Sequence, residues 1–236
     1  MKSKFGFLAK LEFLQTISSS LIAALNPAMI HNLEKYYIIK KVHYLSAIEN
    51  VEGDYLEFGV FTGSSFCHAI RCSKKTEYLN PTVKKTRFYG FDSFSGFGEI
   101  KEDDEHSFYT DENFNTDFKK VEKRVKKVAK DTSFSLIPGF FNESLASGPD
   151  TFGIKKARII FVDSDTYSSS REALTFCEKI IQKGTFIILD DYYSYKGSKS
   201  KGVKRAFDEC VLNCGLEVRR VFTYGMGGAV YIVSNM

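Results

Sequence analysis

Apolar positions along the chain follow two different periods. In segment 5–30 they fall at helical spacing and predict an amphipathic helix, with Pro27 marking a break near its end. Segment 33–50 repeats this spacing and predicts a second leading helix. Beyond it, short runs that are apolar throughout alternate with helical segments, a pattern typical of a parallel sheet covered on both faces.

This alternation predicts the strands and the helices between them. Strands are expected at 55–60, 87–91, 133–137, 157–162, 185–189, 217–222 and 229–233. Helices are expected at 64–73, 116–130, 142–146 (a short turn or helix), 168–182 and 200–213. A glycine-rich turn joins the last two strands, so the terminal hairpin adds an antiparallel strand. The sequence therefore predicts a doubly wound α/β fold with a mostly parallel, seven-stranded sheet.

The pattern also suggests two parts of the chain. We expect residues 1–50 to form an N-terminal helical extension and residues 51–236 to form the α/β domain. The apolar stripe of the first helix needs a partner, and a neighbouring subunit in a homo-oligomer is the interpretation we favour. Closure of the helix over the cleft is the alternative, and membrane-surface binding fits less well because the polar face holds few basic residues. No apolar stretch reaches about 20 residues, so no stable membrane insertion is expected.

Composition narrows the class of protein. With 236 residues, of which 43% are hydrophobic and 26% charged, the chain has the composition of an ordinary globular domain. A net charge of +4 is too mild to indicate nucleic-acid binding. The five cysteines are scattered without zinc-ligand spacing, which favours reduced thiols and a cytoplasmic location.

Candidate chemistry lies after the strands, since open sheets of this kind bind ligands outside the carboxyl ends of their strands. After the first strand, Gly59 and Gly63 allow a sharp turn and close approach to a ligand, and the next helix is expected to begin at Ser64 or Ser65 with free N–H groups. Glu57 followed by this spacing suits the two polar ends of an amino-acid-like ligand, and the spacing differs from that of nicotinamide enzymes. Many strand–turn–helix junctions contain two glycines, so this signal alone is weak.

The next two strand ends predict a nucleoside site. A carboxylate at Asp92, followed by Ser93, is placed to accept hydrogen bonds from both ribose hydroxyls, while a helix cap or turn aspartate is the alternative. Gly139 and Phe140 lie in the turn after the third strand, where an aromatic ring can stack on a base. Packing in the core explains that ring about as well.

The fourth and fifth strands end in aspartates. Asp163 follows one strand and Asp190 and Asp191 follow the other, so adjacent parallel strands would bring three carboxylates together. Like charges at such a distance are costly unless a cation neutralises them. Hard oxygen ligands suit Mg²⁺, and we favour a magnesium site over helix caps. Asp165, two residues past the strand, is expected to cap the next helix instead.

Four segments together resemble successive motifs of the macrocin O-methyltransferase family: YLEFGVFTGSS, YGFDSFSGF, FVDSDTYSSS and GTFIILDDY. The resemblance covers about residues 33–234, and more distantly the chain is similar to catechol O-methyltransferase. It implies a class I methyltransferase fold and S-adenosylmethionine as cofactor, with Asp92 on the ribose. It implies that the methionine end lies against Glu57, Gly59, Phe61, Gly63 and Ser65. It also implies Mg²⁺ held by Asp163, Asp190 and Asp191.

The residue that accepts the proton stays open. Catechol-type enzymes carry a lysine base three residues beyond the first metal aspartate, and Thr166 stands there in this chain, so a lysine base is not supported. Asp163 is the catalytic residue that we favour, acting while it remains a ligand. His106 is the alternative, although a loop histidine without a known partner is more often incidental. It lies in the long segment 93–115, which is rich in aromatic residues and expected to form a lid.

These observations predict an S-adenosylmethionine-dependent, Mg²⁺-assisted O-methyltransferase. Its expected acceptor is a hydroxyl of a sugar, a sugar nucleotide, or a sugar-containing natural product or surface glycan precursor. A catechol or another small molecule is the alternative acceptor. Two rivals belong to other classes: a hydrolase or phosphatase that uses the same carboxylates, and a methyltransferase-like scaffold without turnover.

Overall fold

A seven-stranded sheet forms the centre of the molecule. The computed structural model describes residues 11–109 and 114–236, and the strands lie in the order β3-β2-β1-β4-β5-β7-β6. Their bounds are β1 (Asp54–Phe58), β2 (Phe88–Asp92), β3 (Phe134–Pro138), β4 (Ala157–Val162), β5 (Phe186–Leu189), β6 (Glu217–Tyr224) and β7 (Gly228–Asn235). The first five pair in parallel, and β7 runs antiparallel to both β5 and β6. The predicted doubly wound fold with its terminal antiparallel hairpin is confirmed.

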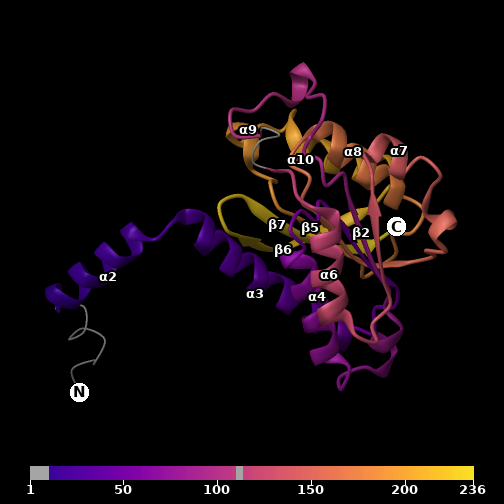
Figure 1. Cartoon of the computed structure of the whole chain (residues 1–236), viewed down its shortest axis with the longest axis horizontal. Helices are drawn as coiled ribbons and strands as arrows, with labels where there is room; N and C mark the ends of the chain where they lie inside the picture. Colours follow the sequence, from indigo (N-terminus) through magenta and orange to yellow (C-terminus); the bar gives the residue numbers. More distant parts are fainter. Residues whose placement is uncertain (1–10, 110–113) are drawn as a thin grey trace.

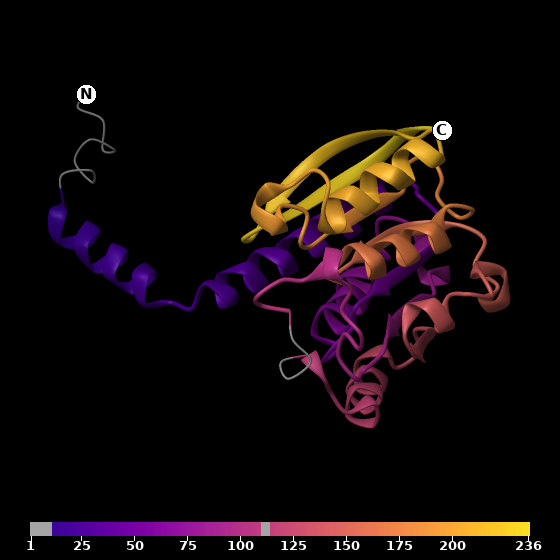
Figure 2. The ribbon, with the colours of Figure 1, turned by 90° about the horizontal axis from the view of Figure 1, so that it is seen from above.

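Helices cover both faces of this sheet (Figures 1 and 2). One face carries α3 (Pro27–Ile48), α4 (Ser64–Thr76) and α6 (Phe118–Ala129). The other face carries α7 (Phe141–Ser144), α8 (Tyr167–Cys177) and α10 (Gly202–Asn213). Shorter elements in the connections are η1 (Pro81–Lys85), η2 (Glu102–Asp104), η3 (Pro149–Phe152) and α9 (Ser194–Gly197).

Alternate residues of the central strands belong to two apolar cores. In β4, Ile159 and Phe161 face the layer of α3, α4 and α6, whereas Ile160 and Val162 face the layer of α7, α8 and α10. All four side chains are fully buried. Strands covered on both faces are mostly apolar along their length, and buried exceptions such as Glu57 in β1 and Arg158 in β4 are hydrogen-bonded. The aspartate side chains that line a cavity instead lie at or just beyond the strand ends.

The two leading helices are separated at Pro27, as the sequence predicts. The first described helix, α2, spans Glu12–Ala24, and Asn26 caps α3 by accepting a hydrogen bond from the backbone N–H of Ala28. Pro27 starts α3 because the first turn of a helix leaves its N–H groups unpaired in any case. The second helix begins at Pro27 and therefore earlier than the predicted residue 33. Residues 5–10 of the first predicted helix lie outside the described chain. α8 is also shorter than predicted and ends at Cys177.

The two leading helices have different surroundings. α2 has no buried residue and reaches away from the sheet (Figure 1), with Phe13 75% exposed and Leu21 63% exposed. The second half of α3 belongs to the core, where Ile39 and Val42 are fully buried. Within the described ranges, no single helix is long and apolar enough to cross a membrane. α2 and α3 pass that test only as a pair, and the pair is bent by 93°.

Candidate active site

A cavity of about 590 Å³ opens at the carboxyl ends of the strands. Its wall is formed by residues that follow β1, β2, β4 and β5, by the start of α3, by described residues of segment 93–115 and by the turn between β6 and β7. Open α/β sheets bind their ligands at this edge, and the volume is that of a small-molecule site. The cavity therefore lies where the sequence analysis expects the chemistry.

Three carboxylates meet in this cavity. Asp163, Asp190 and Asp191 each offer an oxygen atom, and these atoms lie within 4.8 Å of one another. The sheet fixes their backbones, since the N–H of Asp163 donates to the carbonyl of Phe58 at 2.8 Å and the N–H of Asp190 donates to that of Val162 at 3.0 Å. The two parallel strand ends thus bring together the residues predicted to hold a metal.

Asp165 does not cap α8, and that prediction is wrong. Thr166 is the N-cap, and its hydroxyl accepts a hydrogen bond from the N–H of Ser169 at 3.4 Å. Asp165 has a left-handed backbone conformation with φ of 62°, lines the cavity and hydrogen-bonds to Asp191. It is a fourth acidic side chain of the site, because the backbone reverses direction before the helix begins.

The four carboxyl groups carry more negative charge than burial tolerates. Burial raises the pKa of Asp163 well above its usual range, and the charge of Asp190 raises it further. Burial and the charge of Asp191 likewise raise the pKa of Asp165, and burial and Asp190 raise that of Asp191. An additional cation would stabilise the ionised forms of these groups.

Two basic side chains of α3 reach the same carboxylates. The Lys35 Nζ lies 3.0 Å from Asp163 Oδ2 and 2.7 Å from Asp190 Oδ2, and the His31 Nε2 lies 3.1 Å from the latter atom. The hydroxyl of Tyr224, at the end of β6, donates to Asp190 Oδ1 at 2.6 Å. Burial favours a neutral Asp190, but the charge of Lys35 and the hydrogen bond of His31 outweigh it and hold the pKa of Asp190 below its usual range.

These partners of the aspartates were not predicted from the sequence. His31 and Lys35 are four residues apart and share one side of a helix, which is a signal that the sequence does contain. Tyr224 lies at the edge of the glycine-rich turn, without any local feature that marks it. Tyr109 and Ser194 hydrogen-bond to Asp191 Oδ1 at 3.2 and 3.0 Å. No local sequence feature identifies these two residues either. Each of these contacts depends on how distant segments pack.

The predicted cofactor residues fall into two groups. Those that line the cavity are Gly59, Phe61, Asp92, Ser93 and Phe140. Those outside its lining are Glu57, Gly63, Ser65 and Gly139. The Glu57 side chain is fully buried behind the first turn and accepts hydrogen bonds from Tyr55 at 2.5 Å and from Ser65 at 2.6 Å. Burial raises the pKa of Glu57 to about 7. It supports the turn after β1 from within the protein.

The turn after β1 is shaped by the neighbouring strand. A Cβ at Gly59, whose φ is +96°, would lie 1.8 Å from the carbonyl oxygen of Asp163. Glycine is thus required by the close approach of β4, whereas the sequence analysis attributed it to a ligand. Phe61 has φ of 48° and donates its N–H to Asp92 Oδ2 at 2.7 Å, while Asp92 Oδ1 accepts from Phe94 at 2.6 Å. Asp92 is therefore a turn aspartate that also faces the cavity.

The described residues of segment 93–115, which are 93–109 and 114–115, form an aromatic wall of the cavity. Its lining side chains include Phe97, Phe108, Tyr109 and Phe114. Asp104 fastens the segment to α8 by accepting a hydrogen bond from the N–H of Tyr167 at 2.7 Å. The His106 ring stacks on Tyr109 with centroids 4.3 Å apart, and its Nδ1 accepts from the Phe108 N–H at 3.3 Å. His106 thus faces the cavity with partners from its own segment, and its role as a base stays a prediction.

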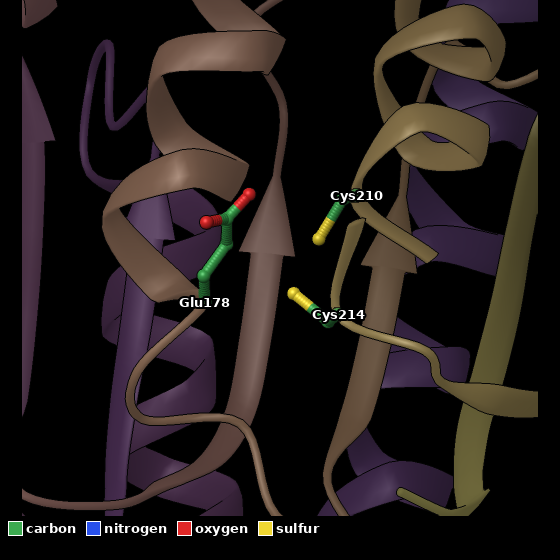
Figure 3. Close-up of side chains that lie close together, drawn as sticks. All are labelled: Glu178, Cys210 and Cys214. Atoms are coloured by element: carbon green, nitrogen blue, oxygen red, sulfur yellow. The ribbon is translucent and has the colours of Figure 1, made fainter. Parts of the chain in front are cut away.

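A second group of possible metal ligands lies elsewhere. Glu178, Cys210 and Cys214 come together at the C-terminal ends of α8 and α10, whereas the cavity adjoins the start of α8 (Figure 3). Burial raises the pKa of both thiols, and the nearby charge of Glu178 raises them further. The thiols are therefore protonated at neutral pH.

Comparison with known proteins places the chain in a family. The model of the macrocin-O-methyltransferase family matches residues 31–209. The chain belongs to this family. The resemblance of its four motifs is thereby confirmed, and the matched range contains the aspartates, the turn after β1 and the two basic residues of α3.

One curated relative and two solved structures extend this finding. Mycinamicin III 3''-O-methyltransferase of Micromonospora griseorubida is 26% identical over 153 residues, which cover 61% of this chain and only 57% of that protein. The O-methyltransferase NovP is 20% identical with a TM-score of 0.67, covering 85% of this chain and 79% of that one. CalS11, a TDP-rhamnose 3'-O-methyltransferase, is 19% identical with a TM-score of 0.58, covering 91% and 86%. At these identities the two structures show a shared fold.

Proposed function

We propose that this protein is an S-adenosylmethionine-dependent O-methyltransferase that acts on a hydroxyl of a sugar. One observation carries the proposal: a chain of the macrocin-O-methyltransferase family brings three aspartates together in a cavity at the carboxyl ends of its strands. The family disfavours a hydrolase or phosphatase, and the three clustered aspartates disfavour a methyltransferase-like scaffold without turnover.

The cofactor fits the half of the cavity nearest β1 and β2. The backbone of Gly59 lines that half. The Asp92 carboxylate accepts hydrogen bonds from backbone N–H groups and can also accept them from ribose hydroxyls. Phe140 is 39% exposed on the wall and offers a ring for the adenine. The positive end of α4 lies directly beyond this turn and favours the carboxylate of an amino-acid ligand.

The acceptor half of the cavity suits a sugar ring. Phe97 and Phe108 present aromatic faces, and the carboxylates beside them accept hydrogen bonds from hydroxyl groups. Among the described lining residues there are five aspartates against one lysine, which disfavours a phosphate group deep in the cavity. We therefore propose that the sugar end of the acceptor enters the cavity. This holds whether the acceptor is a glycoside or a sugar nucleotide, such as the TDP-rhamnose in the description of CalS11.

We propose that the active enzyme also binds Mg²⁺, and the residues present fit this ion. Asp163, Asp190 and Asp191 offer hard oxygen ligands within reach of one ion. The pKa values of Asp163 and Asp191 are raised, and a bound cation would stabilise their ionised forms. Mg²⁺ bound there would act as a Lewis acid that lowers the pKa of the acceptor hydroxyl.

Methyl transfer from sulfur to oxygen releases the proton of the acceptor hydroxyl, and a side chain must take it. Asp163 remains a candidate base. Asp165 is a second candidate, because it lines the cavity and does not belong to the three clustered metal ligands, so that it can take a proton without loosening a metal. Replacing each by asparagine separates them: the base variant loses turnover but keeps metal affinity, whereas a ligand variant loses both.

The decisive experiment measures product and binding separately. The purified protein is incubated with S-adenosylmethionine, Mg²⁺ and a panel of glycosides, sugar nucleotides and catechols, and released adenosylhomocysteine is quantified by mass spectrometry. Calorimetry with adenosylhomocysteine tests the cofactor site without an acceptor. A protein that does not bind adenosylhomocysteine contradicts the proposal and leaves the phosphatase alternative. Turnover of catechols only would correct the acceptor.

We also propose that the N-terminal extension serves assembly of a homo-oligomer in the cytoplasm. The exposed apolar residues of α2 need a partner, and the described cysteines are all free, which suits a reducing compartment. Deletion of residues 1–26 should lower the mass in light scattering while cofactor affinity persists. A truncated protein that keeps its mass but loses acceptor affinity would instead favour a cover for the cleft.

A further inference from the structure

Every oxygen atom of the Asp190 carboxylate already has a partner from the protein. Oδ1 accepts the hydroxyl of Tyr224 at 2.6 Å, and Oδ2 is contacted by both Lys35 and His31. These donors converge on Asp190 from two separate elements, α3 and β6. A metal ion that uses Asp190 as a ligand must therefore share or displace a protein contact.

Lys35 is the partner that occupies the position of a cation. Its ammonium bridges Asp163 Oδ2 at 3.0 Å and Asp190 Oδ2 at 2.7 Å, and its side chain is only 11% exposed. The ammonium group thus lies between two of the three clustered carboxylates.

We propose that Lys35 is a built-in competitor of the divalent cation at this site. Its ammonium binds Asp163 and Asp190 in the metal-free protein and withdraws when a metal ion takes the same oxygen atoms, because two cations at such a short separation repel each other strongly. This inference rests on the metal part of the proposed function. It goes beyond it by assigning to a residue of α3 the control of metal affinity.

The fold allows Lys35 to move without dislodging its helix. The first turns of α3 are held to the turn between β6 and β7 by other contacts: Glu34 accepts from the N–H of Gly225 at 2.5 Å, and His31 Nδ1 accepts from that of Met226 at 3.2 Å. A lysine side chain has a flexible four-carbon stem and can adopt several alternative rotamers. Only the Lys35 side chain needs to leave the carboxylates, and helix α3 stays in place beside the cavity.

Metal binding in the absence of cofactor and acceptor tests this inference. Mn²⁺ is titrated into the full-length protein, the free ion is measured by electron paramagnetic resonance, and Mg²⁺ is added as a competitor. Lys35→Met and Lys35→Gln should each bind the ion about ten-fold more tightly than the wild type, the scale on which residues around metal ligands act. Lys40→Met removes the same charge from an exposed position of the same helix and should leave the affinity unchanged.

Thermal unfolding in EDTA provides the second measurement. Both Lys35 variants should unfold at a lower temperature than the wild type without metal, because their carboxylates have lost a counter-charge, and Mg²⁺ should restore more stability to them than to the wild type. Unchanged or weaker metal affinity in both variants overturns the competition, and weaker affinity would make Lys35 a residue that positions the ligands. Wild type and variants that all fail to bind metal overturn this inference together with the magnesium site, whereas methyl transfer would be unaffected.

Discussion

Two groups of possible metal ligands differ in their surroundings: one follows the strands β4 and β5, and the other lies at the C-terminal ends of α8 and α10. In each group, three ligand atoms lie within 4.8 Å of one another. The group of Asp163, Asp190 and Asp191 lines a cavity of about 590 Å³ and is contacted by Lys35 and His31. The group shown in Figure 3 is absent from that lining and has two thiols whose pKa values burial raises.

The comparison teaches that proximity of ligand atoms does not by itself make a metal site. A thiol can stay neutral when it is buried, so Cys210 and Cys214 relieve their mutual repulsion by keeping their protons. Asp190 differs, because Lys35 and His31 contact it and hold its pKa below the usual range, so that it stays ionised. The aspartates thus differ from the two packed cysteines in two properties: they carry surplus negative charge, and they are accessible from a cavity.

The largest effect is expected from the aspartates. Asp190→Asn should lower kcat/KM by more than about 100-fold, because it removes the negative charge of a metal ligand and one of the two oxygen atoms that Tyr224, His31 and Lys35 contact. Adenosylhomocysteine affinity measured by calorimetry should stay within a few-fold. Cys214→Ala is the matched control from the other group and should retain full activity. Wild-type activity of Asp190→Asn, or full activity of the wild type in EDTA, would remove the distinction between the two groups.

A large loss of stability is expected from Gly59→Ala. The added Cβ would lie 1.8 Å from the Asp163 carbonyl oxygen, so the backbone that carries the first aspartate must shift. We expect the free energy of unfolding to fall by about 3 kcal/mol or more, measured in urea, since backbone strain of this kind has no flexible side chain to absorb it. Gly148→Ala, where nothing lies within 4 Å of the new Cβ, is the control for a glycine with positive φ. Equal losses in both variants would show that φ alone, and not contact with β4, explains Gly59.

How far the sequence predicts this site follows from the range of each interaction. The convergence of Asp163 with Asp190 was predictable, because buried strands are readable from their apolar runs and parallel strands end at one edge. The orientation of Asp165 was not, since a left-handed residue before a helix leaves no clear mark in the sequence. Lys35 reaches Asp163 across 128 positions, and only the packing of α3 on the sheet decides that contact.

A moderate, pH-dependent effect on the free energy of unfolding is expected from Glu57, which lies in β1 just before the turn at Gly59. Its pKa is raised by burial to about 7, compared with about 4.3 in an unfolded chain. The native state therefore binds the proton more tightly, so the contribution of Glu57 to stability is complete below about pH 4.3 and is lost as the pH rises through about 7, at about 1.4 kcal/mol per unit of pKa difference. Urea unfolding between pH 4 and pH 8 measures this slope in the wild type and in Glu57→Gln. A slope that is the same in both proteins would assign the pH dependence to other groups.

The smallest effect is expected from the second group of ligands, and it is the sharpest check on the comparison. Cys214→Ala removes a partly exposed thiol at the end of α10, and the free energy of unfolding should change by no more than about 0.5 kcal/mol. The measurement is differential scanning fluorimetry at pH 7 in an Asp191→Asn background, which weakens Zn²⁺ binding at the aspartates. Because the thiols of Cys210 and Cys214 keep their protons at neutral pH, one equivalent of Zn²⁺ should raise the unfolding temperature of neither Asp191→Asn nor its Cys214→Ala derivative. A rise in unfolding temperature that appears with Cys214 and disappears without it would show that Glu178, Cys210 and Cys214 bind a metal after all.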